Sequence, residues 1–136
     1  KYDTSPFLKI VKDASDWIRE APAHGDFTVR AMFELEDGKI GIIDGEHYGQ
    51  HGLLYYDPAW FYLRMRLEQQ DLESAQKYLK NLYKLLSNED KKIFWKELKP
   101  VLTQRFIGHL WGAKDKDEEL QKLDPIGQDI LSDQII

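Results

Sequence analysis

A predicted β-hairpin with an aspartate on either side is the feature that most constrains the fold of this chain. Residues 31–36 alternate partly between apolar and polar side chains, and residues 39–43 return as a short apolar strand. Asp37-Gly38 between them is a strong signal for a two-residue hairpin turn. Asp26 lies in the preceding loop, and Asp44 ends the second strand eighteen residues later. The hairpin therefore lies between two carboxylates.

Helical patterns surround the hairpin. Ser5 and Pro6 read as an N-cap and first helical residue, and apolar side chains recur at helical spacing until near Glu20, since Pro22 disfavours helix just before it. Residues 23–30 form a loop. Residues 45–56, which contain three glycines, are expected to form an ordered loop, and Asp57-Pro58 then starts an apolar helix as N-cap and first residue.

The rest of the chain reads as helices separated by prolines and glycine. We expect helices over 71–86, from Ser87 to a break at Pro100, and over 101–111, with a solvated charged segment next. Asp124-Pro125 restarts a short terminal helix. The sequence predicts a single α+β domain over residues 1–136, mainly helical, with one β-hairpin.

Composition restricts the classes of function. The chain has 136 residues, 42% of them hydrophobic and 32% charged, which fits a globular domain with a real core. Its net charge of -5 argues weakly against a nucleic-acid partner. It has no cysteine, no run near the ~20 apolar residues of a membrane span, and no secretory segment. We expect a cytoplasmic protein with no membrane partner.

Three short motifs occur in a characteristic order: His24-Gly25-Asp26, Ile43-Asp44 and Asp57-Pro58-Ala59. With this spacing, residues 24–62 resemble the catalytic region of the aminoglycoside phosphotransferase and choline kinase family, which has a protein-kinase-like fold. The resemblance implies the helical C-terminal lobe of a small-molecule kinase. The intact enzyme would transfer the γ-phosphate of ATP or GTP to a hydroxyl of a small-molecule substrate.

The resemblance also implies roles for the two acids. Asp26 matches the catalytic acid, which accepts or orients the proton of the substrate hydroxyl. Asp44 matches the Mg²⁺ ligand, a role that suits an anionic oxygen because Mg²⁺ usually takes one or two protein carboxylates. We expect His24 to support the loop, and Asp57 to tie its helix to the site.

The sequence departs from the family in two places. Ala31 stands five residues after Asp26, where the family has a metal-binding Asn, so one metal site is weakened or lost. Ala31 fits either a degenerate enzyme or an engineered substitution. No glycine-rich phosphate loop occurs in the 23 residues before His24, so the nucleotide-binding N-terminal lobe is expected to be absent and to be a partner. This chain alone should have little kinase activity.

Two other classes of function stay open. Ala31 and the expected lack of a nucleotide lobe also suit a non-catalytic kinase-like module for binding or regulation. A weaker alternative is a helical interaction domain whose resemblance to kinases is accidental.

Several other polar residues allow a site or a structural role. Glu46 could touch metal or substrate, or be a solvated loop acid. His47 and His51 have the spacing of a helical zinc site, but the nearby glycines argue against a helix. His109 reads as a satisfied core or boundary residue. The lysines of residues 77–99 alternate with acids and predict a solvated helix face.

Overall fold

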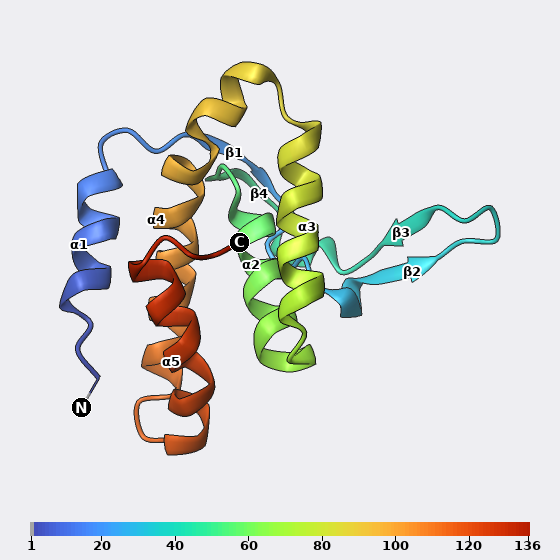
Figure 1. The fold of residues 1–136 in the computed structure, drawn as a ribbon. Coiled ribbons are helices and arrows are strands. Elements are labelled where there is room, and N and C mark those ends of the chain that lie inside the picture. The colour runs from blue at the N-terminus through green and yellow to red at the C-terminus, as the bar shows by residue number, and fades with distance from the viewer. Residues whose placement is uncertain (1) are drawn as a thin grey trace.

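A long helix, α4 (Asn88–Gly112), lies in the middle of the protein, and the other helices are arranged around it (Figure 1). The computed structural model describes residues 2–136. Helices α1, α2 and α5 pack on α4, and α3 packs on α2. Their bounds are α1 Ser5–Ala14, α2 Tyr56–Arg64, α3 Leu72–Leu85 and α5 Asp117–Leu131. With two small antiparallel sheets, this confirms the predicted α+β, mainly helical class.

The predicted hairpin is present as β2 (Met32–Glu34) and β3 (Ile40–Ile42), and it projects away from the helices (Figure 1). The turn between the two strands differs from the predicted two-residue turn at Asp37-Gly38. The Leu35 amide donates to the Lys39 carbonyl at 2.7 Å, the Gly38 amide donates to the Leu35 carbonyl at 2.9 Å, and Gly38 has φ +78°. The loop therefore has three residues and ends with a left-handed glycine. Ile40 and Ile42 are exposed, so the apolar side chains of this strand do not pack into the core.

A second sheet pairs β1 (Glu20–Ala23) with β4 (Gly49–Leu53), so the prediction of a single hairpin was wrong. The sequence pattern instead predicts a helix that ends near Glu20 and loops over residues 23–30 and 45–56. Glycine, alanine and proline have low strand propensity, and the pairing joins segments far apart in the chain. Gly52 allows this pairing, because a Cβ there would lie 2.8 Å from Ala23 Cβ.

Pro100 was predicted to break a helix and Pro125 to start one, and both predictions were wrong because each proline lies inside a helix. Helix α4 continues through Pro100, and α5 continues through Pro125. An internal proline costs about 3 kcal/mol, in part through the lost backbone hydrogen bond. Around Pro100, however, Leu98 and Val101 are fully buried, and burying each such side chain stabilises by about 1.5–3 kcal/mol. Packing of the helix in the core therefore outweighs the local cost.

The first helix is shorter than predicted. Helix α1 begins at Ser5, whose amide donates to Asp3 Oδ1 at 3.0 Å, so Ser5 is not the N-cap. It ends at Ala14, whose carbonyl accepts the amides of Trp17 and Ile18 in a closing turn. This early end leaves Glu20 free to begin β1.

The hydrophobic core lies along α4. Its fully buried side chains meet those of α2, α3 and α5, and the set includes Phe94, Leu98, Leu102, Phe106, Leu63, Leu79 and Ile130. The C-terminal tail also packs inward, since Tyr62 Oη donates to the Ile135 carbonyl at 3.1 Å.

None of the helices within residues 2–136 combines the length and the apolar character needed to cross a bilayer.

A bidentate ion pair joins the segment between α1 and β1 to α4. Arg19 Nε and Nη2 each lie 2.6 Å from a carboxylate oxygen of Glu97, and Arg19 Nη2 also lies 3.0 Å from Asp90 Oδ1. Glu97 is 5% exposed. The adjoining Arg19 carbonyl accepts the Leu54 amide, so the ion pair also fixes the chain beside the β1–β4 sheet.

Glu97→Ala should lower the free energy of unfolding by about 2–4 kcal/mol, because it removes a buried, doubly bonded partner of Arg19. Urea unfolding followed by circular dichroism measures this change. Glu89→Ala, on the same helix but with its side chain 83% exposed, is the matched control and should change stability by less than about 0.5 kcal/mol. Equal effects of the two substitutions would contradict the importance of the Arg19–Glu97 pair.

Candidate functional site

The carboxylate of Asp57 holds the loop that carries Asp26. Asp57 Oδ2 accepts the His24 amide at 2.7 Å, and Oδ1 accepts the Gly25 amide at 3.0 Å. The prediction that Asp57 is the N-cap of its helix was wrong, because α2 begins at Tyr56. Its side chain instead binds a loop 32 residues earlier, through hydrogen bonds strengthened by its charge. The expected tie between this helix and the site is therefore present.

His24 connects the same loop to the end of β3. Its Nε2 lies 2.8 Å from the Ile43 carbonyl, and its Nδ1 accepts the Asp26 amide at 3.3 Å. An accepting Nδ1 requires the proton of the neutral ring to be on Nε2, which then donates to Ile43. These bonds fit the expected supporting role of His24, and they bring the segment of Asp26 beside the residue that precedes Asp44.

Asp26 is half-buried and is oriented by a tryptophan. Trp60 Nε1 donates to Asp26 Oδ1 at 3.0 Å. The sequence makes the aromatic residues between 55 and 62 mostly core candidates and does not single out Trp60, so its contact with Asp26 was not predicted. A signal existed in the sequence: Trp60 follows Asp57 by three residues on a predicted helix, so both project from the same face. Helix α2 therefore fixes the loop backbone through Asp57 and the Asp26 side chain through Trp60.

Asp44 is exposed and has left-handed backbone geometry, with φ 60° and ψ 44°. Aspartate tolerates this conformation better than most residues. Its side chain makes no capping hydrogen bond to the short turn Gly45–His47 that follows. Just before it, the Ile43 amide donates to the Ala31 carbonyl at 2.9 Å. Asp44 thus lies where β3 returns to the loop that carries Asp26.

Gly25 permits the close contact between this loop and the turn after Asp44. It has φ +91°, and a Cβ there would lie 2.2 Å from the His47 carbonyl oxygen. Any other residue would be strained in backbone and in packing. Ala31, at the position of the expected asparagine, is 2% exposed and presents a methyl group without a ligand atom.

The other candidate ligands do not gather into a metal centre. His47 Nε2 lies 3.6 Å from Glu46 Oε1, whereas His51 Nδ1 lies 3.5 Å from Glu20 Oε2. His51 is in β4 and not on a helix with His47. Within residues 2–136, no group of three or more His, Cys, Asp or Glu side chains is placed to hold a metal.

Beside Asp26, α2 and α4 form a group of aromatic and basic side chains that the sequence did not reveal. This Trp60 cluster comprises Tyr56, Trp60, Arg64, Arg105 and His109. The rings of Trp60 and His109 stack with centroids 5.4 Å apart, and Arg105 Cζ lies 4.7 Å from the Trp60 ring. Arg64 Cζ lies 5.3 Å from the same ring. The cluster depends on the register of two helices, which no local pattern encodes.

His109 was predicted to be a satisfied residue, but its Nε2 is buried and has no hydrogen-bond partner within the described chain. Burial lowers the pKa of His109, and the charges of Arg64 and Arg105 lower it further, against smaller opposing effects of Glu68 and Glu119. The ring is therefore neutral near pH 7.

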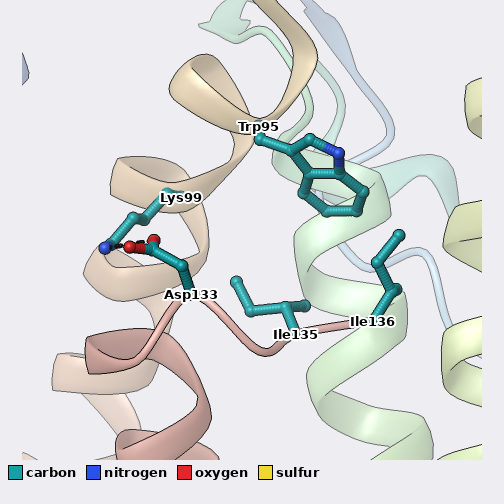
Figure 2. Close-up of a pocket in the computed structure, with 5 residues that line it drawn as sticks. All are labelled: Trp95, Lys99, Asp133, Ile135 and Ile136. Atoms are coloured by element: carbon teal, nitrogen blue, oxygen red, sulfur yellow. Dashed lines mark hydrogen bonds and ion pairs between the residues drawn. The ribbon is translucent and has the colours of Figure 1, made fainter.

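Two hollows lie elsewhere on the protein. One, of about 340 Å³, is lined by Trp95, Ile135 and Ile136 and by the ion pair of Lys99 with Asp133 (Figure 2). The other, of about 760 Å³, lies between α1, α4 and α5 and is lined mainly by apolar side chains. Neither is lined by Asp26 or Asp44.

Comparison with known proteins gave no relatives: no family model, no curated protein and no solved structure matches this chain.

Asp57→Asn should destabilise the protein by about 1–3 kcal/mol, because an amide offers one acceptor where two backbone amides now bind a charge. Hydrogen exchange should accelerate at the His24 and Gly25 amides. Asp37→Asn, at the exposed hairpin turn, is the control and should leave exchange at both amides unchanged. Unchanged protection in Asp57→Asn would show that the loop is held by other contacts.

The lowered pKa of His109 predicts that stability falls as the pH drops below about 7. The unfolded chain gains the proton near the ordinary value of 6.5, whereas the folded ring resists it until a lower pH, so protons favour unfolding in this window. Urea unfolding at pH 7.5 and 5.5 measures the loss. His109→Gln should lose less stability between these pH values, and an equal loss would exclude His109 as the cause.

Proposed function

We propose that this chain is the C-terminal catalytic and substrate-binding lobe of a small-molecule kinase. In this proposal, Asp26 orients the acceptor hydroxyl and Asp44 binds the Mg²⁺ of the nucleotide. One observation carries the proposal. Asp57 binds the His24-Gly25 backbone while His24 binds the Ile43 carbonyl, so three motifs that are dispersed along the chain meet at one place.

Asp26 has an environment suited to a positioning acid. A carboxylate is ionised at neutral pH and can accept the proton of a hydroxyl as it attacks a phosphoryl group. The Trp60 indole occupies one of its oxygens, Oδ1, at 3.0 Å. A fixed carboxylate holds its second oxygen in a constant direction, which favours in-line positioning of an acceptor.

Asp44 fits a magnesium ligand by its chemistry and exposure. It offers a hard anionic oxygen, and Mg²⁺ at nucleotide sites is typically bound by one or two carboxylates together with phosphate oxygens and water. When bound, the ion would neutralise charge on the nucleotide phosphates. The Ala31 methyl group does not fit a second ligand. The proposal therefore assigns Asp44 as the metal-binding side chain.

A non-catalytic binding module is the second candidate, and the buried Ala31 methyl group favours it. A site that lacks one ligand can bind a nucleotide without arranging it for transfer. This candidate predicts nucleotide binding without turnover in the full-length protein.

The proposal is tested with Mn²⁺ and ATP, because the paramagnetic ion broadens NMR signals of nearby amides. We expect broadening centred on residues 43–46, lost in Asp44→Asn and retained in the control Asp37→Asn. In the full-length protein, Asp26→Asn should lower kcat by about 100-fold or more while retaining the broadening. Broadening that is absent, or unaffected by Asp44→Asn, would contradict the metal role. Turnover that survives Asp26→Asn would contradict the acid role.

A further inference from the structure

Two guanidinium groups lie close to Asp26, although the chain has a net charge of -5. Arg64 and Arg105 both lie against the Trp60 ring, whose indole nitrogen binds Asp26. Glu68 forms an ion pair with Arg64 and also lies 3.7 Å from Arg30. One carboxylate thus pairs with both Arg30 and Arg64, and it forms no ion pair with Arg105.

Among Arg30, Arg64 and Arg105, only Arg105 has a charge without an ion-pair partner within the described residues. It is half-buried and contacts the faces of Tyr56, at 5.1 Å, and Trp60, at 4.7 Å. No ion pair to Arg105 is formed within residues 2–136. Aromatic faces attract a cation, but by only about 0.5–2 kcal/mol, and they satisfy none of its N–H directions. Arg105 therefore carries a charge that no anion within the described residues compensates.

The unpartnered atoms indicate the chemistry of a ligand that would suit this cluster. Within the described residues, Nε of Arg64, Nε of Arg105 and Nε2 of His109 are buried without a hydrogen-bond partner. The two arginine nitrogens are donors, and leaving a buried donor unpaired costs about 1–3 kcal/mol. The remaining unpartnered atom, Glu68 Oε2, is an acceptor that suits a hydroxyl hydrogen. A ligand with anionic oxygens and a hydroxyl matches this set.

We propose that Arg64 and Arg105 bind a carboxylate or phosphate group of the acceptor substrate, which places the acceptor hydroxyl at Asp26. The inference rests on the proposed kinase function, and it names the substrate class: a small anionic hydroxyl compound. Trp60 links the two parts of the site, because its ring lies against both guanidinium groups while its N–H binds the acid. A positively charged amine is disfavoured at this position by repulsion from both arginines.

The test uses the intact chain without nucleotide or metal, with inorganic phosphate, malonate and choline as probes. NMR signals of the Trp60 indole N–H and the His109 ring report on the cluster. We expect saturable shifts with phosphate or malonate and none with choline. Saturation with phosphate or malonate should also raise the pKa of His109, since a bound anion offsets the repulsion from the arginines. A merely structural cluster would not produce this shift. The anion that binds more tightly shows whether the acceptor's group is a phosphate or a carboxylate.

Substitutions test whether the anion binds at Arg105. Arg105→Gln should weaken anion binding by about tenfold or more, and Arg105→Lys should weaken it less. Lys80→Gln makes the same charge change on the exposed face of α3 and should have little effect. If Arg105→Gln does not fold, Arg64→Gln provides the same measurement. Equal weakening by Lys80→Gln, comparable shifts with choline, or no saturable shift would overturn the inference.

The two proposals fail separately. Anion binding at Arg105 without Mn²⁺ and ATP at Asp44 would leave an anion site and contradict the kinase function. Metal and nucleotide at Asp44, without anion binding, would leave the kinase function and contradict this choice of substrate.

Discussion

The arrangement of the site depends on one carboxylate, that of Asp57, and its two bonds to the His24 and Gly25 amides. Helix α2 is anchored by Ala59, Tyr62 and Leu63, which are buried in the core. Asp57 therefore fixes the loop of His24 and Gly25, which has no regular structure, to a helix that is held firmly by the core. A charged acceptor suits this task, because it binds two amides that a loop would otherwise leave to water.

Much of the fold follows from local patterns, and the errors have physical causes. Asp71 and Ser87 begin their helices as the sequence predicts, since each side chain accepts an amide three residues later. The predicted helix break at Pro100 was wrong, because a rule based on local sequence counts the lost backbone hydrogen bond but not the burial of Pro100 and its neighbours in the core. Strand β1 was missed because its stability comes from a distant partner, β4, and not from its own residues.

The candidate site likewise has a part that the sequence indicates and a part that it does not. Asp26, Asp44 and Asp57 could be selected from the sequence because motif order carries information that single residues lack. Trp60 could have been inferred from its spacing to Asp57. Arg105 and His109 could not, because their relation to Asp26 passes through the packing of α4 on α2 and through the stacking of two rings. Tertiary packing alone creates that part of the site.

In the proposed enzyme, opposite charges surround Asp26. The turn after β3 is acidic, with Asp44 and Glu46, and would attract a cation. The Trp60 cluster is basic and would attract an anion. Phosphoryl transfer to an anionic acceptor brings together two negatively charged reactants, whose repulsion must be offset before the hydroxyl can approach. With Ala31 reducing the metal ligands on one side, the arginines on the other side become the main protein source of positive charge. In that enzyme, the ligand missing at residue 31 and the unpaired charge of Arg105 would both bear on the same repulsion between the reactants.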